Sequence, residues 1–215
     1  MIFPVIKHKR HFWRLQRAIC LVVVLLFFYG HSFAADALEI GSKAPNILGN
    51  DALNGQRVNL YRVMSELQFK RDKNGMLIRD KNGKYINEFK RYVLVLSFFS
   101  RSCIPCIREI PTLNRIANRY RNHDVKLLYI NVDPELSREQ ARRFIETYSI
   151  EVPMMLCNQA EVIRKYDARV LPRLVVIDRD KKIAQIITGL DKQLEASLDG
   201  IIQDLLPQSE QTNQL

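Results

Sequence analysis

The chain has 215 residues, a length that suggests one domain of ordinary size with an appendage, or two very small domains. Apolar residues make up 47% and charged residues 26%, which is typical of globular rather than disordered proteins, and 4 cysteines are too few for a disulfide-rich scaffold. The net charge is +10, but residues 1–34 hold five basic residues and no acid. The rest of the chain has 28 basic against 23 acidic residues, or +5, so the charge is weak support for binding nucleic acid and we predict no such partner.

The first 34 residues are typical of an export signal. Five basic residues precede an uncharged apolar run, Ala18–Tyr29, whose 12 residues fall short of the roughly 20 that a membrane-spanning helix needs. Ser32 and Ala34 then place small side chains before a cleavage site. We predict a signal peptide over residues 1–34 or, alternatively, an uncleaved anchor over residues 18–35. In both cases the rest of the chain is exported to the periplasm, either soluble or anchored.

Strand and helix patterns alternate in the second half of the chain. Strands are expected at residues 93–99, 125–132, 152–156, 174–178 and 182–188. Helices are expected at residues 107–120, after a capping box at 137–140, at 159–165, and from 191 onward. This order predicts an α/β fold with a mixed central sheet, helices on both faces, and a closing hairpin at 179–181. We assign the folded domain to residues 35–206 and a frayed tail to residues 207–215.

An internal repeat of eight residues precedes the first buried strand. Arg71–Gly75 (RDKNG) recurs as Arg79–Gly83 with the same five residues. Each Asn-Gly pair suits a type I′ turn, so we predict a small β-meander of three strands from Gln68 to Phe89, within an insertion at about residues 67–91. The repeat lacks the further ligands of an EF-hand, and the purpose of the insertion stays open.

Two cysteines lie where the first buried strand meets the next helix. Cys103 and Cys106 are three residues apart, so they can close a disulfide within one helical turn, and Pro105 suits the first turn of a helix. Cys103 falls at the helix terminus, where unpaired amides and the helix dipole stabilise a thiolate. We therefore predict that Cys103 is the attacking sulfur and that Cys106 resolves the mixed disulfide.

Zinc binding and a purely structural disulfide are the alternatives for this pair. After Ala34 the chain has one further cysteine, Cys157, and one histidine, His123, so a second pair of ligands at zinc spacing is missing and we predict no metal. A disulfide that closes so short a loop gains little chain entropy, which makes stability a weak reason for it. Cys157 itself suits a small buried hydrophobic position better than a third redox role.

The chain resembles the thioredoxin-like TlpA/ResA/DsbE group of exported thiol–disulfide oxidoreductases. The resemblance spans residues 36 to about 206 and rests on the segments VLVLSFF (93–99), CIPC (103–106), REIP (108–111), VLP (170–172) and LVVID (174–178). It implies a thioredoxin-like fold and protein-disulfide oxidoreductase activity that needs no cofactor. Its partners would be exported protein thiols or disulfides and a membrane electron donor, with the membrane reached only through the possible N-terminal anchor. It also implies that Pro172 is cis beside the cysteines, which leaves the backbone of Leu171 free to bind an extended substrate.

The sequence departs from this group at three positions. Ser102 replaces the aromatic residue before the first cysteine, and Ser97 stands where thioredoxin has an acid, so water or another group must move the proton of Cys106. Arg173 replaces the small residue after the proline. Arg101 and Arg173 could both lower the pKa of Cys103, although the alternative that they point to solvent stays open.

The predicted function is disulfide exchange with exported proteins, with reduction favoured and a role in cytochrome c maturation as one form of it. A peroxiredoxin-like peroxidase is an alternative, but Leu96 stands where that chemistry places a proline, although Ser100 fits its nearer position. A non-catalytic assembly factor, which holds an exported apoprotein or binds copper, is a second alternative. His123 is the only candidate copper ligand beyond the cysteines, and it falls too early in the chain.

Overall fold

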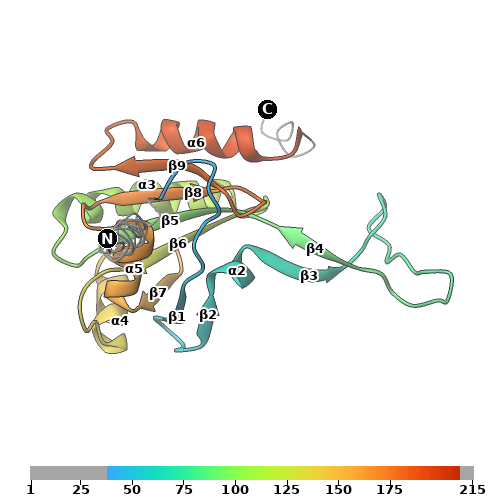
Figure 1. The fold of residues 1–215 in the computed structure, drawn as a ribbon, viewed down its shortest axis with the longest axis horizontal. Helices are drawn as coiled ribbons and strands as arrows, with labels where there is room; N and C mark the ends of the chain where they lie inside the picture. Colours follow the sequence, from blue (N-terminus) through green and yellow to red (C-terminus); the bar gives the residue numbers. More distant parts are fainter. Residues whose placement is uncertain (1–37, 209–215) are drawn as a thin grey trace, which may run out of the picture. The chain divides into compact units, whose positions relative to one another are not determined.

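The structure, a computed structural model, describes residues 38–208 (Figure 1). A seven-stranded sheet has the order β2-β1-β7-β6-β5-β8-β9, in which β5, β6 and β7 run parallel and the other neighbours antiparallel. The strands are β1 (Leu48–Asp51), β2 (Arg57–Asn59), β5 (Val93–Phe99), β6 (Val125–Asn131), β7 (Met154–Cys157), β8 (Arg173–Ile177) and β9 (Ile183–Thr188). The helices are α2 (Leu60–Val63), α3 (Ile104–Arg119), α4 (Arg138–Thr147), α5 (Gln159–Tyr166) and α6 (Leu194–Leu205). The predicted α/β fold with a mixed sheet is confirmed.

The predictions for the two ends of the chain fall on undescribed residues. The signal peptide or anchor over residues 1–35 and nearly all of the tail at 207–215 lie outside the described range. The contacts divide the chain into two units between residues 37 and 38, and everything reported below belongs to the second unit. Across residues 38–208, no helix combines the length and the apolar character that crossing a membrane requires.

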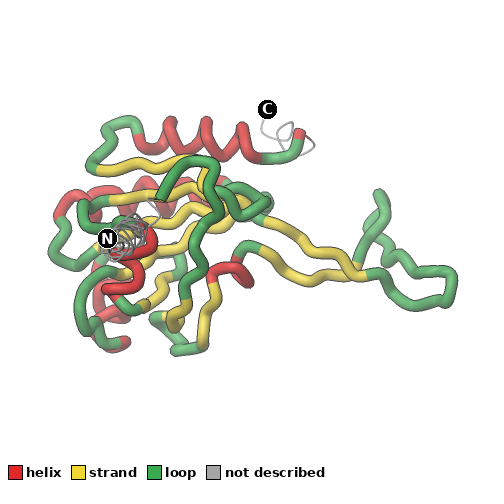
Figure 2. Tube along the Cα trace, in the orientation of Figure 1, coloured by secondary structure: helices red, strands yellow, loops and turns green. Residues whose placement is uncertain are grey.

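Strand β5 is buried at every position because both faces of the sheet are covered. On one face Val93, Val95 and Phe99 pack with residues of α3, α4 and α6. On the other face Leu94, Leu96 and Phe98 pack with residues of α5 and α2. Figure 2 shows the strands between these helices. Apolar side chains on both sides of one strand explain why its sequence is an unbroken apolar run rather than an alternating one.

Strands β1 and β2 form an antiparallel edge that the sequence patterns did not predict. Their sequences, LGND and RVN, are short and lack apolar alternation. The pairing of β1 with β7 requires close approach at Gly49, where an added Cβ would lie 2.5 Å from the carbonyl oxygen of Leu156. Contact with β7, rather than local propensity, therefore defines this edge.

The predicted three-strand meander is wrong. Strands β3 (Ser65–Phe69) and β4 (Asn87–Arg91) form a separate two-stranded ribbon, and we call residues 65–91 the arm. Beyond the ribbon, the amide of Lys70 donates to Ile86, that of Ile86 to Ile78, and that of Ile78 to Lys70, at 2.8, 3.1 and 2.9 Å. These three bonds form a ring from which the ribbon and two short loops extend, so the segments do not pair side by side.

The turn type explains why the meander does not form. The carboxylate of Asp72 accepts hydrogen bonds from the amides of Asn74 and Met76, and only Gly75 takes a positive φ, +81°. This is a type I turn followed by a left-handed residue, and not the type I′ turn that Asn-Gly suggested. Asp80 caps the second repeat in the same way. Each repeat therefore closes its own small loop.

Candidate active site

The junction between β5 and α3 places the two cysteines at the start of a helix. Cys103 is the N-cap of α3, its Sγ accepts a hydrogen bond from the amide of Cys106 at 3.2 Å, and Pro105 lies in the first turn. The two sulfurs form a disulfide, with 5.3 Å between the Cα atoms. Cys106 is 4% exposed, whereas Cys103 is half-buried. An incoming partner therefore reaches the sulfur of Cys103 before that of Cys106.

The loop before Cys103 is held by the end of the neighbouring strand β6. One carboxylate oxygen of Asp133 accepts from the backbone amide of Arg101 at 2.9 Å, from its Nε at 3.2 Å, and from the amide side chain of Asn131 at 3.0 Å. The charge of Arg101 is thus offset by that of Asp133. Arg101 lies two residues before Cys103, and its guanidinium pairs with a carboxylate.

Leu171 and Pro172 lie at the same end of the sheet as the cysteines. Strand β8, which follows them, pairs with β5 in a register that sets Arg173 opposite Phe98. Leu171 packs on the same apolar cluster as both cysteines, and the peptide bond between Leu171 and Pro172 is cis. The carbonyl of Pro172 accepts from Gly189 at 2.8 Å, whereas no described residue forms a hydrogen bond with the backbone of Leu171. That backbone is open to a bound peptide.

Arg173 lies on the other face of the sheet. Its neighbour Leu174 packs in the layer of the cysteines, so strand alternation places Arg173 with Val175 in the opposite layer. The side chain is buried, and one of its terminal nitrogens donates to the hydroxyl of Thr188 at 2.8 Å while its Nε has no partner. The sheet thus separates its guanidinium from the helix that carries Cys103.

Glu109 is a residue of the site to which the sequence analysis gave no role. It lies on α3 one turn after Cys106 and is 3% exposed, and neither carboxylate oxygen has a hydrogen-bond partner. Burial, with a smaller contribution from the charge of Asp191, raises the pKa of Glu109 to about 7. A glutamate three residues after Cys106, directly before the buried Ile110, was the signal available in the sequence, since i and i+3 share a helix face.

Glu109 lies close enough to Tyr129 of strand β6 for its charge to act on the Tyr129 hydroxyl. Tyr129 of that strand is buried, its hydroxyl has no hydrogen-bond partner, and its pKa is raised by burial and further by the charge of Glu109. Tyr129 pairs in register with Ser97, the position where thioredoxin has an acid. Strand β5 has Ser97 where thioredoxin has an acid. Helix α3 instead places the carboxylate of Glu109 in the same layer, on the side of the sheet that holds the cysteines.

Cys157 lies apart from the cysteine pair. It ends β7 and packs on the layer opposite to that of Cys103 and Cys106. Burial, and to a lesser extent the charge of Glu161, raises the pKa of Cys157 to about 12, so its thiolate is scarce at neutral pH. Among residues 38–208, no three or more His, Cys, Asp or Glu side chains are grouped as a metal site would require.

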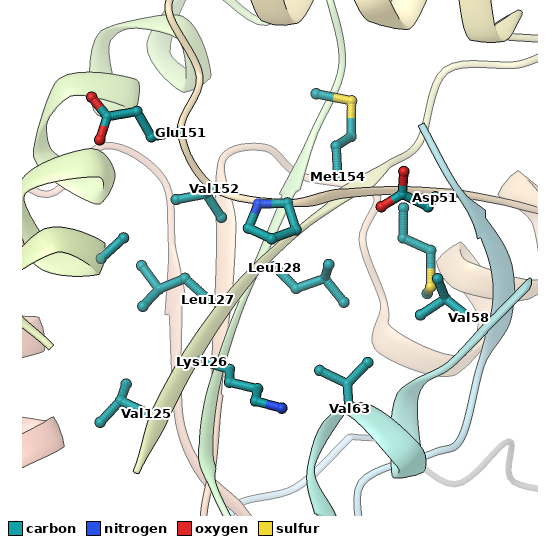
Figure 3. Close-up of a pocket in the computed structure, with 13 residues that line it drawn as sticks. Asp51, Val58, Val63, Val125, Lys126, Leu127, Leu128, Glu151, Val152 and Met154 are labelled. Carbon is teal, nitrogen blue, oxygen red and sulfur yellow. The ribbon is translucent and has the colours of Figure 1, made fainter. Parts of the chain in front are cut away.

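A cavity lined mostly by apolar side chains lies near the start of β6 (Figure 3). Its volume is about 450 Å³, and its lining includes Val58, Val63, Leu127, Val152 and Met154. The cavity lies where β6 begins, whereas the cysteines follow the end of β5, which runs parallel to β6. The cavity therefore does not belong to the cysteine site.

Comparison with known proteins agrees with this geometry. The model of the AhpC/TSA family matches residues 79–186. The thiol-disulfide oxidoreductase ResA of Geobacillus kaustophilus (strain HTA426) is 30% identical over 119 residues, which cover 54% of this chain and 67% of that protein. ResA of Bacillus thuringiensis subsp. konkukian (strain 97-27) is 23% identical over 189 residues, which cover 88% of this chain and 91% of that protein.

Solved structures of low sequence identity share the fold. The thioredoxin domain of a thiol-disulfide oxidoreductase from Bacteroides vulgatus superposes with a TM-score of 0.58 at 19% identity, over 77% of this chain and 99% of that one. A thiol:disulfide interchange protein of the thioredoxin family from Chlorobium tepidum TLS gives 0.55 at 18% identity, over 80% and 100%. The predicted thioredoxin-like fold is confirmed.

Proposed function

The chain belongs to the AhpC/TSA family and is a thiol-disulfide oxidoreductase of the ResA and DsbE type, and from this premise we propose that it reduces disulfide bonds of exported proteins in the periplasm. Residues 1–34 direct export, and residues 35–206 form the thioredoxin-like domain that carries out disulfide exchange. Cys103 and Cys106 are the catalytic pair. Leu171 and Pro172 hold the backbone of the client protein.

The observation that carries this proposal is the unequal exposure of the two sulfurs. Cys103 is half-buried at the helix terminus, whereas Cys106 is 4% exposed behind it. A client disulfide therefore meets one sulfur only, and the second can act only after the first has reacted. The unpaired backbone of Leu171 beside Cys103 supports a client bound in an extended conformation.

The reaction transfers two electrons to the client. In the reduced protein, the thiolate of Cys103 attacks one client sulfur; the client S–S bond breaks, the other client sulfur leaves as a thiolate, and a mixed disulfide forms. Cys106 gives its proton to the Glu109 carboxylate and attacks the sulfur of Cys103, which releases the second client thiolate. One client thiolate takes a proton from water and the other takes it from Glu109. A membrane electron donor then restores the Cys103–Cys106 dithiol.

The charges around the pair favour reduction of clients over oxidation. When the thiolate of the reduced form is strongly stabilised, the disulfide form is a strong oxidant, as in DsbA. Here the charge of Arg101 is offset by Asp133, and Arg173 lies across the sheet. The buried Glu109 adds a carboxylate that disfavours a second negative charge nearby. Only the helix terminus and the amide of Cys106 remain to lower the pKa of Cys103.

Two measurements test the proposal. The reduction potential of the Cys103/Cys106 couple in glutathione buffers should lie near that of thioredoxin, about −270 mV. Cys103→Ser should abolish insulin reduction, whereas Cys106→Ser should accumulate a mixed disulfide with the client. A potential near about −120 mV, as in DsbA, would instead assign the protein as an oxidant. A reductant of this kind could serve exported apocytochrome c, which can be tested as a client in the same assay.

A further inference from the structure

The arm presents three apolar side chains on one face, and each of them is more than half exposed in the described structure. Leu67 and Phe89 are register partners on one side of the β3–β4 ribbon, and strand alternation adds Phe69 to the same side. Leu67, Phe69 and Phe89 are 62%, 51% and 66% exposed. Met76, in the first loop beyond the ribbon, is 68% exposed, and the ring of Tyr85 in the second loop lies 5.5 Å from that of Phe69.

The opposite side of the ribbon is polar and bound to the domain. Glu66 accepts hydrogen bonds from Lys126 and from Tyr92. Lys90 forms an ion pair with Asp124 at 2.6 Å. These contacts fix the polar side of the ribbon against residues 124–126.

On the apolar side, the domain meets the base of the ribbon, where Arg91 pairs with Asp180 and Phe89 lines a shallow hollow with Arg179 and Lys181. Because both sides of the base are anchored, the apolar exposure is a feature of the fold rather than of a loose loop.

The far end of the arm holds most of the net charge of the chain after residue 34. Residues 70–85 contain six basic and two acidic residues, a net charge of +4, while the whole chain after residue 34 has +5. The two acids, Asp72 and Asp80, are occupied in accepting amides of their own turns. Lys73, Lys81 and Lys84 are exposed and form no ion pair with any described residue. Positive charge is therefore concentrated in the loops beyond the apolar ribbon.

The arm extends from one end of the sheet, and the dithiol lies at the other end. The amide of Tyr92, next to β4, bonds to Met64 where β5 begins, whereas Cys103 follows the end of β5. The seven residues of β5 span about 20 Å. Figure 1 shows β3 and β4 extending from one end of the sheet, away from the end where α3 begins. A surface that holds the arm would leave the dithiol facing away from it.

We propose that the arm binds an anionic membrane surface through Leu67, Phe69 and Phe89, with the lysines of its loops on the lipid headgroups. Apolar side chains at the acyl boundary with basic residues around them are the pattern of interfacial membrane binding. Two copies of the arm would bring two charges of +4 together, which disfavours self-association. An acidic protein would need a shaped partner surface, whereas a fluid bilayer accommodates side chains spread over a ribbon and two loops. This proposal goes beyond disulfide exchange and adds a second membrane contact to the predicted N-terminal one.

The test uses the chain from residue 35 onward, which contains the whole sheet and both core layers and lacks the apolar run of residues 18–29. It should co-sediment with vesicles of phosphatidylglycerol and phosphatidylcholine, and not with phosphatidylcholine alone. A charge variant, K73Q/K81Q/K84Q, should weaken binding at least about tenfold. An apolar variant, L67S/F69S/F89S, should also lose it, while the matched exposed pair at the other end, L190S/K192Q, should bind like the parent.

A fluorescence measurement reports where the arm lies. Trp13 is the only tryptophan of the chain, so the form that begins at residue 35 has none. A tryptophan introduced by Phe89→Trp should shift its emission to the blue on addition of anionic vesicles, because its ring enters a less polar layer. The control Leu190→Trp, at the other end of the domain, should not shift.

Three results would overturn the proposal. If the parent and the charge variant bind vesicles equally well, the lysines of the arm are not the residues that bind the vesicles. If the parent sediments as a dimer and L67S/F69S/F89S sediments as a monomer, the apolar face binds a second copy of the chain. Binding to poly-glutamate without binding to vesicles would assign it to an acidic protein. Insulin reduction by all variants serves as the folding control, and its loss in the parent would contradict the proposed function without bearing on the arm.

Discussion

At the scale of single residues, the burial of the Glu109 carboxylate carries an electrostatic cost. Its carboxylate is buried beside the apolar residues of α3, with both oxygens unpartnered. Such a group fits the folded protein when protonated and disfavours it when ionised. A pKa of about 7 lets it change state at neutral pH, which is what a group that accepts and returns the proton of Cys106 requires.

Glu109→Gln should make the oxidised protein more stable at alkaline pH. The folded pKa of Glu109, about 7, lies above its ordinary value of 4.5, so its favourable contribution is complete below pH 4.5 and is lost as the pH rises through 7. The loss is about 2 kcal/mol after solvent screening is allowed for. Urea unfolding at pH 4.5 and pH 8 should show a smaller decrease for the variant than for the parent.

The same variant should separate stability from catalysis. If Glu109 takes the proton of Cys106, Glu109→Gln should slow insulin reduction at pH 7 by at least about tenfold despite its greater stability. Glu195→Gln replaces a half-buried carboxylate of α6 that pairs with arginines on α3; it is the matched control and should leave the rate unchanged. Equal rates for parent and Glu109→Gln would contradict the assigned proton transfer.

At the scale of elements, the site is assembled by contacts between chain segments. Asp133, at the end of β6, holds the loop that joins β5 to α3 through both the backbone and the side chain of Arg101. The same carboxylate accepts from Asn131, so three donors share one oxygen. This arrangement fixes the conformation of the loop before Cys103. It also offsets the positive charge of Arg101, which would otherwise stabilise the thiolate of Cys103.

Asp133→Asn should make the protein less reducing. The neutral amide oxygen can still accept from the loop, but the charge of Arg101 is then no longer offset and stabilises the thiolate of Cys103. The reduction potential should become less negative by about 30 mV, equivalent to about 1.4 kcal/mol. The measurement is equilibration of the dithiol with glutathione buffers.

A second substitution identifies the cause. The double variant Arg101→Gln with Asp133→Asn should return the potential toward that of the parent, because both charges are then absent. Arg101→Gln alone should make the potential more negative, because the charge of Asp133 is then no longer offset and disfavours the thiolate of Cys103. A potential that stays shifted in the double variant would mean that Asp133 acts through loop geometry and not through the charge of Arg101.

At the scale of the whole molecule, the arm and the redox site lie at opposite ends of one sheet. Residues 65–91 contribute no side chain to either core layer, and the links of the arm to the domain are polar pairs such as Lys90–Asp124. Strands β5 and β8, which position the cysteines and Pro172, do not depend on it. The two parts should therefore be separable.

Replacing residues 66–90 by a short Gly-Ser linker should leave a folded, active oxidoreductase. The ends are already together, since the amide of Tyr92 donates to the carbonyl of Met64 at 3.0 Å. The pairs Lys90–Asp124 and Lys126–Glu66 are lost, but the buried Asp124 keeps Arg179 as a partner, so the free energy of unfolding should fall by about 1 kcal/mol. Insulin reduction should stay within about twofold of the parent while binding to anionic vesicles is lost. Loss of reduction in a folded deletion variant would show that the arm takes part in catalysis.

The sequence alone predicted those features that depend on neighbours along the chain. The unbroken apolar run of β5, the capping box of Ser137 and Gln140, and the placing of Cys103 at a helix terminus are all local patterns, and the structure has each of them. The cis bond before Pro172 followed from the resemblance and is present. Such features follow from periodicity, capping and motif because the groups that determine them are a few residues apart.

Only the tertiary structure decided how distant groups combine. The same turn occurs at Asp72, at Asp80 and at Asp178, where Lys181 takes the left-handed position, yet the first two close separate loops and the third joins paired strands. The burial of Glu109, the pairing of Arg101 with Asp133 and the side of the sheet taken by Arg173 likewise depend on partners far apart in sequence. A charge has its effect through distance, exposure and counter-charge, and these quantities exist only once the sheet and its helices have packed.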